Sequence, residues 1–217
     1  MKTSKNKFIR VLIADDHEVV RQGIKTILSE TPDLRVVAEA EDGMEVLEKI
    51  QELDVDVILL DFDMPRKSGL DTLIELKALR PKLPVLMLSI FPEDHYGLRF
   101  LKAGASGYLG KASVSAQLVE AVRKVAQGGK FISPVLTDKL VSELNHDTEG
   151  PLHEKLTDRE FQVFHCIASG KRLKAIAEEL HLSINTVSTY RSRILEKMEM
   201  ESNSDLIRYA IKNSLIK

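Results

Sequence analysis

Short apolar runs alternate with amphipathic segments along the first part of the chain. The runs are rich in Val, Ile and Leu with little polar alternation, which is typical of strands buried on both faces of a parallel sheet. They lie at residues 11–14, 36–40, 55–60, 84–88 and 107–109. Strands and helices that alternate in this way predict an α/β domain with a doubly wound, five-stranded parallel sheet.

The segments between and after these runs carry apolar side chains three or four positions apart, the spacing of helices that bury one face. Four stripes show this spacing: Val20, Ile24, Ile27 and Leu28; Val46, Leu47 and Ile50; Leu70, Leu73 and Ile74; and Leu118, Ala121, Val122 and Val125. Gly128 and Gly129 follow the last stripe, as glycine commonly follows a helix C-terminus. Residues 134–144 predict one more short helix.

The remainder of the chain predicts a separate helical domain. The segment NHDTEGPLHEK, which begins at Asn145, is polar and contains Gly-Pro, a composition typical of a linker. Thr157 and Glu160 then match a capping box, and Ser183 is placed as the N-cap of a later helix. Two short helices joined by a tight turn and followed by a support helix predict a helix-turn-helix. We expect these helices at residues 173–180, from 183 to about 198, and at 202–215.

Composition adds an expected compartment and a charge asymmetry. No stretch approaches the ~18 apolar residues of a membrane helix, and the apolar run near the N-terminus is too short for a secretion signal. The single Cys166 fits a reducing compartment and a small buried side chain, so we expect a cytoplasmic protein. Residues 152–217 hold 11 Lys and Arg against 9 Asp and Glu, so this part carries +2 and leaves −4 for the rest of a chain with net charge −2.

Three carboxylates and a lysine follow strands of the predicted sheet. Asp15 and Asp16 come directly after the first apolar run and Asp61 after the third, and such strand ends meet where doubly wound sheets bind ligands. Carboxylates gathered there repel one another unless a cation compensates, and hard oxygen ligands suit Mg²⁺. Lys111 and Ser89 follow or end other strands and could contact a phosphoryl group. Taken singly, these residues are ordinary turn, cap or surface residues.

The sequences DD, DFDMPRKSG, LS and GASGYLGK resemble the receiver domain of bacterial two-component response regulators, over roughly residues 9–127. The resemblance implies a flavodoxin-like fold with Asp61 as the phospho-accepting aspartate. It also implies a Mg²⁺ ion held directly by Asp16 and Asp61, through water by Asp15, and by the backbone carbonyl of Asp63.

The same resemblance implies roles outside the metal ligands. Lys111 would bind the phosphate, and Ser89 and Tyr108 would be the switch hydroxyl and the switch aromatic, which move together when phosphate arrives. Taken alone, Tyr108 is an ordinary packing residue, and His17 beside the acidic pair is expected to be solvent-exposed rather than a ligand. Three positions depart in size from the family pattern: Phe62, Gly110 and Ile90. The bulk of Ile90 predicts that solvent has restricted access to the phosphoryl group and that the phosphoryl group is lost more slowly.

The third helix of the predicted second domain has two different faces. At about 100° per residue, one side gathers Val187, Tyr190, Ile194 and Met198, and the other gathers Asn185, Ser188, Thr189, Ser192 and Glu196, with Arg191 and Arg193 on opposite flanks. Such a helix can enter a major groove, where short polar groups meet base edges and arginines meet phosphates. An ordinary solvated face is the alternative.

The sequence LTDREFQVFHCIASGKRLKAIAEELHLSINTVSTYRSRILEKM looks like the LuxR-type helix-turn-helix, and with the receiver it is similar to the NarL/FixJ class of response regulators. The resemblance implies that residues 184–198 read DNA. Ser188 and Tyr190 stand where lysine and histidine are common in that family. The last helix is apolar on more than one side, which core packing explains in part and a dimer surface would complete.

We therefore predict a receiver at residues 1–128, a linker helix and linker at 129–151, and a DNA-binding domain at 152–217. The expected function is that of a transcriptional response regulator, not an enzyme. A partner histidine kinase would phosphorylate Asp61, and the phosphorylated protein would bind double-stranded DNA as a homodimer. No membrane partner is expected.

Two other functions stay open. The sequence DFD at residues 61–63 matches the DxD motif of haloacid-dehalogenase-like phosphatases, although that motif normally follows the first strand. The other alternative is a phosphate-independent DNA-binding or protein-interaction module with a relic pocket. The presence of Asp15, Asp16, Asp61 and Lys111 argues against it.

Overall fold

The computed structural model describes residues 8–90, 93–144, 151–180, 182–213 and 215–216. The expectations for the N-terminal residues 1–7 and for linker residues 145–150 lie outside this part. The chain forms two compact units, Met1–Asn145 and His146–Lys217.

The first unit contains a five-stranded sheet in which neighbouring strands are parallel, in the order β2-β1-β3-β4-β5. The strands are β1 (Ile9–Ala14), β2 (Leu34–Ala40), β3 (Val57–Asp61), β4 (Val85–Ser89) and β5 (Gly107–Gly110). All residues of β3 and β4 are buried, because strands inside such a sheet have helices on both sides. The predicted doubly wound α/β fold is confirmed, and the strand order reverses between β1 and β3.

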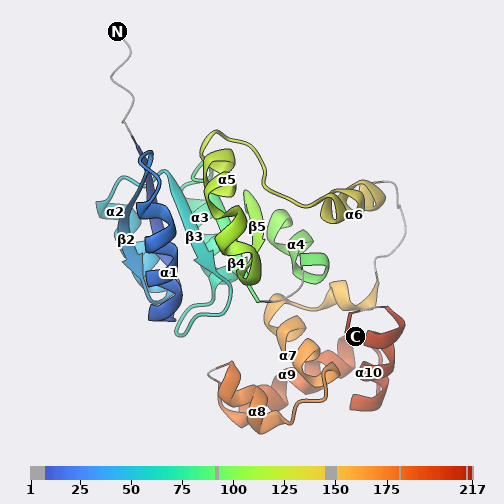
Figure 1. The fold of residues 1–217 in the computed structure, drawn as a ribbon. Coiled ribbons are helices and arrows are strands. Elements are labelled where there is room, and N and C mark those ends of the chain that lie inside the picture. Colours follow the sequence, from blue (N-terminus) through green and yellow to red (C-terminus); the bar gives the residue numbers. More distant parts are fainter. Residues whose placement is uncertain (1–7, 91–92, 145–150, 181, 214, 217) are drawn as a thin grey trace. The chain divides into compact units, whose positions relative to one another are not determined.

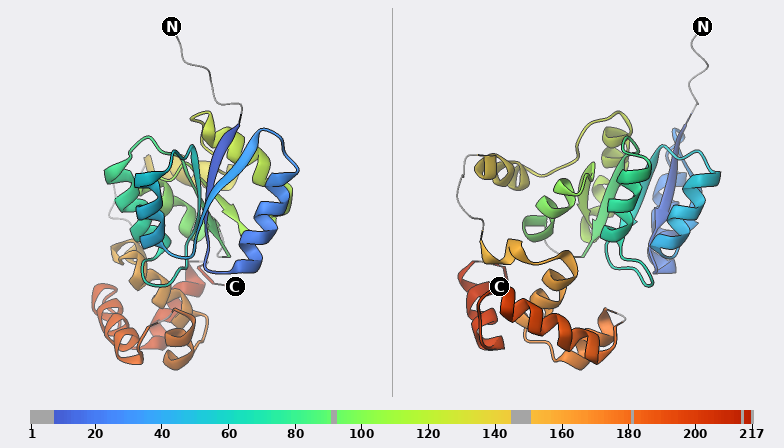
Figure 2. Two further views of the ribbon diagram at one scale, coloured as in Figure 1. Left: turned by 90° about the vertical axis from the view of Figure 1, so that its left-hand side faces the viewer. Right: turned by 180° about the vertical axis from the view of Figure 1, so that it is seen from behind.

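Helices cover both faces of this sheet (Figures 1 and 2). The helices of this unit are α1 (Glu18–Ser29), α2 (Gly43–Glu52), α3 (Gly69–Leu79), α4 (Glu93–Lys102), α5 (Val114–Ala126) and α6 (Pro134–Leu144), with a short 3-10 turn η1 (Lys111–Ser113) before α5. On one face, Ile24 and Leu28 of α1 and Leu118 and Val122 of α5 join a continuous core with the strands. α2 and α3 lie on the opposite face (Figure 2).

The sequence stripes identify four of the five helices that alternate with the strands and leave α4 unmarked. Tyr96, Gly97 and Phe100 form its buried side, where the other helices present mostly Leu, Ile and Val. The buried face of α4 is therefore aromatic, so this helix lacks the aliphatic spacing that marks the other helices in the sequence. The short helix expected at residues 134–144 is confirmed as α6.

The second unit consists of helices. They are the 3-10 turn η2 (Leu152–Lys155), α7 (Asp158–Ala168), α8 (Leu173–Glu179), α9 (Ile184–Lys197) and α10 (Asn203–Lys212). The Thr157 backbone N–H donates to Glu160 Oε2 at 2.8 Å, and Ser183 Oγ accepts from the Thr186 N–H at 3.0 Å, so both predicted caps are confirmed. The expected end of the last helix at residue 215 is wrong, because α10 ends at Lys212.

The core of this second unit includes Cys166, which is 1% exposed, as predicted. Among the described helices of the whole chain, none combines the length and the apolar character needed to cross a lipid bilayer.

Gly69 begins α3 directly against the end of β3. Its N–H donates to the Phe62 carbonyl at 2.9 Å, and an added Cβ atom would collide with the Asp61 carbonyl. We expect Gly69→Ala to lower the free energy of unfolding of the first unit by about 2–4 kcal/mol, because the backbone on both sides has no room to move. Urea unfolding followed by far-UV circular dichroism measures this change.

Gly23→Ala in α1 is the matched control. Nothing lies within 4 Å of its added Cβ, and alanine favours a helix interior by about 1 kcal/mol. The control should therefore stabilise the protein. Equal unfolding midpoints for the two variants would contradict the close packing of α3 on β3.

Candidate functional site

The carboxyl ends of neighbouring strands bring the predicted site residues together. Ala14 of β1 pairs with Leu60 of β3 in the sheet register, so the residues that come next, Asp15 and Asp61, leave adjacent strands at the same level. Lys111 follows β5 at the same edge. This is the edge where the strand order reverses and where doubly wound sheets bind ligands.

Lys111 joins two of the carboxylates. Its Nζ lies 2.7 Å from Asp15 Oδ2 and 3.0 Å from Asp61 Oδ1. The side chains of Asp15 and Asp61 are 0% and 4% exposed, and that of Lys111 is 15% exposed. Because a buried charge without a partner is costly, removal of Lys111 would leave two buried carboxylates uncompensated.

Burial and charge set the protonation of this group. Burial, followed by the charge of Asp15, raises the pKa of Asp61 to about 7, against the opposing charge of Lys111. Burial acts to lower the pKa of Lys111, but the charges of Asp61 and Asp15 outweigh it and raise that pKa. The lysine therefore stays charged, whereas Asp61 needs more positive charge nearby to be fully ionised at neutral pH.

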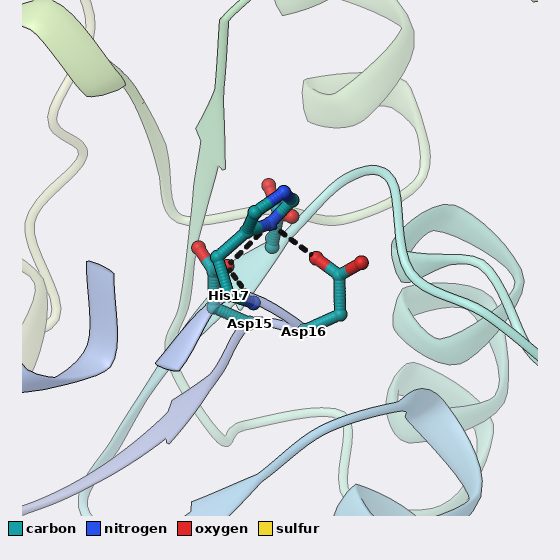
Figure 3. A group of neighbouring side chains, drawn as sticks. Asp15, Asp16 and His17 are labelled. Atoms are coloured by element: carbon teal, nitrogen blue, oxygen red, sulfur yellow. Dashed lines mark hydrogen bonds and ion pairs between the residues drawn. The ribbon is translucent and has the colours of Figure 1, made fainter. Parts of the chain in front are cut away.

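Asp16 and His17 complete a cluster with these residues (Figure 3). One possible ligand atom each from Asp15, Asp16, His17 and Asp61 lie within 4.8 Å of one another. His17 Nδ1 is 2.6 Å from Asp16 Oδ1 and 3.3 Å from Asp15 Oδ1. The exposure expected for His17 is confirmed, since its side chain is 66% exposed. The sequence did not predict that its ring also faces the acidic pair.

The oxygen atoms of this cluster fit a hard divalent cation. Asp15 Oδ2 and Asp16 Oδ1 are buried, and within the described part of the chain each has a single neighbouring nitrogen, Lys111 Nζ at 2.7 Å and His17 Nδ1 at 2.6 Å. Three carboxylates against one lysine leave the site short of positive charge, and carboxylate oxygens are ligands that Mg²⁺ prefers. The role predicted for the backbone carbonyl of Asp63 stays a prediction.

Arg21 on α1 supports the acidic pair, and the sequence analysis did not identify it. Its side chain is 9% exposed, Nη1 donates to the Asp15 carbonyl at 2.7 Å, and Nη2 donates to Glu41 at 2.8 Å. This arginine therefore fixes the turn that carries both aspartates. A signal was available, because Arg21 precedes Ile24 by three positions on an apolar stripe, where a charged residue requires a partner.

Both predicted switch residues are buried, and one of them, Tyr108, belongs to a group of packed aromatic rings. Ser89 and Tyr108 are 2% and 4% exposed, and the Tyr108 ring stacks on Phe100 of α4 with ring centroids 5.8 Å apart. Phe62 packs against Phe100 and Tyr96 with centroids 5.1 and 5.2 Å apart. The large residue at position 62 thus fills the space between β3 and α4.

The other two departures in size lie on a cavity of about 490 Å³ that Ser89 and Lys111 also line. Ile90 is 75% exposed, and nothing lies within 4 Å of a Cβ atom added at Gly110. The glycine therefore leaves this side of the site open. The expectation that Ile90 restricts access to a phosphoryl group stays a prediction.

The predicted DNA-reading helix, α9, has the two faces expected of it. Val187, Ile194 and Met198 are fully buried. The residues predicted to contact DNA that are exposed are Asn185, Ser188, Thr189, Ser192 and Arg193. A buried apolar face opposite short polar groups and an arginine is the arrangement that a major-groove helix requires.

Two cations of α9 have partners within the second unit. Arg191 Nε donates to Asn203 Oδ1 at 2.6 Å, at the start of α10, and its side chain is half-buried. Lys197 Nζ lies 2.6 Å from Glu160 Oε2. Arg193 is exposed, so it is better placed than Arg191 to contact a phosphate.

Two families match the two units of the chain. The response regulator receiver domain family matches residues 11–123, just over half of the chain. The luxR family of bacterial regulatory proteins matches residues 154–210. The acidic site lies within the first match and α9 within the second.

Full-length relatives join the same two parts. The transcriptional regulatory protein DegU of Brevibacillus brevis is 36% identical over 233 residues, covering 100% of this chain and 98% of its own length. The oxygen regulatory protein NreC of Staphylococcus epidermidis is 36% identical over 216 residues, with 96% and 99% coverage. A structure of RcsB from Salmonella enterica serovar Typhimurium, bound to promoter rprA in the presence of phosphomimetic BeF3⁻, has a TM-score of 0.62 at 25% identity and covers 93% of this chain and 98% of its own.

Both units match in sequence order, and the relatives span essentially the whole chain. This chain belongs to the NarL/FixJ class of response regulators, transcription regulators rather than enzymes, in which a receiver domain is joined to a LuxR-type DNA-binding domain.

Proposed function

We propose that phosphorylation of Asp61 by a partner histidine kinase controls DNA binding by this chain. The contact of Lys111 with both Asp15 and Asp61 carries the proposal. An Asp61 carboxylate oxygen attacks the phosphorus of phosphohistidine, the P–N bond breaks, and its electron pair leaves with the imidazole. The Lys111 ammonium stabilises the negative charge of the transferred phosphoryl oxygens.

The acidic cluster is proposed to hold Mg²⁺. Asp16 and Asp61 would bind the ion directly, Asp15 through water, and Asp63 through its backbone carbonyl. When bound, the ion supplies positive charge that favours ionised Asp61 and neutralises phosphoryl oxygens. Arg21 keeps the turn of the acidic pair in place for this task.

Ser89 and Tyr108 are proposed to report phosphorylation. The Ser89 hydroxyl donates a hydrogen bond to the phosphoryl group, and Tyr108 moves with it. Since both lie within the packed core, a new hydrogen bond at Ser89 favours a different packing of the residues around it.

The second unit is proposed to bind double-stranded DNA through α9. The contacting residues would be Asn185, Ser188, Thr189, Arg191, Ser192 and Arg193, with the arginines at phosphates and the others at base edges. On α10, Ile211 is 60% exposed, which supports a homodimer surface that forms on phosphorylation and pairs two such helices.

We assign the receiver to residues 1–128, the linker helix and linker to 129–151, and the DNA-binding domain to 152–217. We propose a cytoplasmic location, because the proposed partners are a histidine kinase and double-stranded DNA.

Asp61→Asn tests the phospho-acceptor. We expect full-length wild-type protein treated with acetyl phosphate and Mg²⁺ to incorporate phosphate and to bind a DNA site selected from a random library about tenfold more tightly. The variant should do neither, because its amide cannot accept the phosphoryl group. Asp54→Asn, at a side chain that is 84% exposed, should behave as wild type. Phosphate-dependent DNA binding by Asp61→Asn would rule out the assignment.

The raised pKa of Asp61 predicts a pH-dependent stability. Between its ordinary value of 3.8 and about 7, the folded chain holds this proton more tightly than the unfolded chain, so the free energy of unfolding falls as pH rises through that range. Without divalent ions, the free energy of unfolding of Asp61→Asn should exceed that of wild type by up to about 4 kcal/mol at pH 8. This difference should shrink toward pH 4. Urea unfolding at several pH values measures it. A stability difference that does not change with pH would show that it does not arise from the raised pKa of Asp61.

Arg193→Ala tests the DNA face of α9. Loss of one phosphate contact should weaken binding to all DNA sequences alike, by about 3- to 10-fold, and should lower the salt dependence of the affinity by about one ion. Arg208→Ala on α10, at a side chain that is 77% exposed, is the control. Fluorescence anisotropy at several salt concentrations measures both variants, and an unaltered salt slope for Arg193→Ala would remove this residue from the interface.

A further inference from the structure

The segment that follows α5 extends the sheet beyond β5. Phe131 forms a parallel bridge with Gly107: its N–H donates to the Ser106 carbonyl at 2.9 Å, and the Tyr108 N–H donates to the Phe131 carbonyl at 3.0 Å. A Cβ atom at position 107 would collide with Phe131, so glycine permits this approach. Because β5 is an edge strand, the segment covers backbone groups that an edge otherwise exposes.

α6 then packs on α4. Leu136 is 0% exposed, and a Cβ atom added at Gly97 would lie 2.7 Å from Leu136 Cδ2. The Ser133 N–H donates to Glu93 Oε1, in the first turn of α4, at 3.2 Å. Among the described side chains of α6, Leu136 is the buried one, and Val141 is 53% exposed. Because Leu136 is the one buried residue among the described side chains of α6, we expect the release of this helix to need far less free energy than unfolding of the domain.

Buried aromatic rings connect this helix-covered surface to Asp61. Phe62, the next residue, packs edge-on against Phe100 of α4. Phe100 stacks on Tyr108 with an interplanar angle of 13°, and the N–H of Tyr108 binds Phe131. All three rings are at most 4% exposed. In a close-packed interior, displacement of one such ring requires displacement of the next.

We infer that α6 is a strap on the surface formed by α4 and the edge of β5, and that phosphorylation of Asp61 releases it. The inference rests on the proposed function, because it takes Asp61 as the phospho-acceptor. A phosphoryl group adds volume and negative charge where Asp61 is 3% exposed. This change reaches α4 through Phe62, which packs on it, and through Ser89, which precedes it in the chain. From α4 the change reaches the contact between Gly97 and Leu136.

Release of the strap changes the length of the tether between the two units. While α6 is held on α4, the first unit fixes the chain as far as Leu144, where α6 ends. Once α6 and the bridge at Phe131 are released, the connection begins near Gly129. A longer tether lets the second unit reach positions that the short one excludes, which is a way to permit pairing on DNA without a new contact surface.

Hydrogen exchange of the full-length chain tests the strap, with beryllium fluoride and Mg²⁺ as the phosphoryl probe and fluorine NMR as the record of its binding to Asp61. In wild type we expect exchange at residues 131–144 to accelerate about tenfold or more on addition of the probe, while β1 and β3 stay protected. Asp61→Asn should show no acceleration.

Two variants act on the strap from opposite sides. Leu136→Ala removes its buried side chain and Gly97→Ala pushes against it, so residues 131–144 should exchange rapidly before the probe is added. Val141→Ala, at an exposed position on the same helix, is the matched control and should behave as wild type. Undiminished protection of residues 131–144 in both strap variants would overturn the inference.

The outcomes for wild type separate this inference from the function beneath it. If the probe binds Asp61 and DNA affinity rises while residues 131–144 keep their protection, the strap is wrong and the proposed function stands. If the probe does not bind Asp61, both are wrong.

Discussion

Mutual repulsion of carboxylates at one buried edge of the sheet is the constraint on which this protein depends. Asp15 and Asp61 have lost nearly all contact with water, and one ammonium group, from Lys111, lies between them. Such a group is stable only if the backbone that carries it cannot spread apart. Arg21 behind the Asp15 carbonyl and Gly69 against the end of β3 provide that rigidity. The residual shortage of positive charge is what favours the proposed binding of a cation at this site.

Phe62, the large residue that follows Asp61, joins this edge of the sheet to α4. Phe62 fills the space between β3 and α4 with a ring, and a ring transmits displacement over a greater distance than a short aliphatic side chain does. Phe100 and Tyr108 continue the contact to the edge of the sheet. These ring contacts are the route by which the proposed change of charge at Asp61 would act on α4 and β5.

Two of the cations on the DNA-binding helix α9 have polar or acidic partners within the same unit. Arg191 is bound to Asn203 and Lys197 to Glu160, so part of the positive charge of α9 is already compensated within the domain. With a net charge of only +2 on residues 152–217, attraction to the phosphate backbone is weak for a single copy. In the proposed function, pairing of two copies and the short polar groups of α9 would then supply more of the affinity and the specificity.

The sequence by itself determined the two-unit organisation, the parallel sheet and the membership of Asp15, Asp61 and Lys111 in one site. Apolar periodicity is a property of each segment alone, so it identifies the strands and helices along the chain. Once the strands are known to be parallel, the residues that follow them are expected at a common edge of the sheet. The tertiary structure alone decided the packing of α4 against Phe62 and Tyr108, the partner of Arg191, and the contact of Leu136 with Gly97. These contacts join different elements of the chain, and their existence depends on packing and register that no local pattern of residues specifies. The ring of His17 lies beside Asp16 because of the conformation of the turn after β1, which the residue types alone do not determine either.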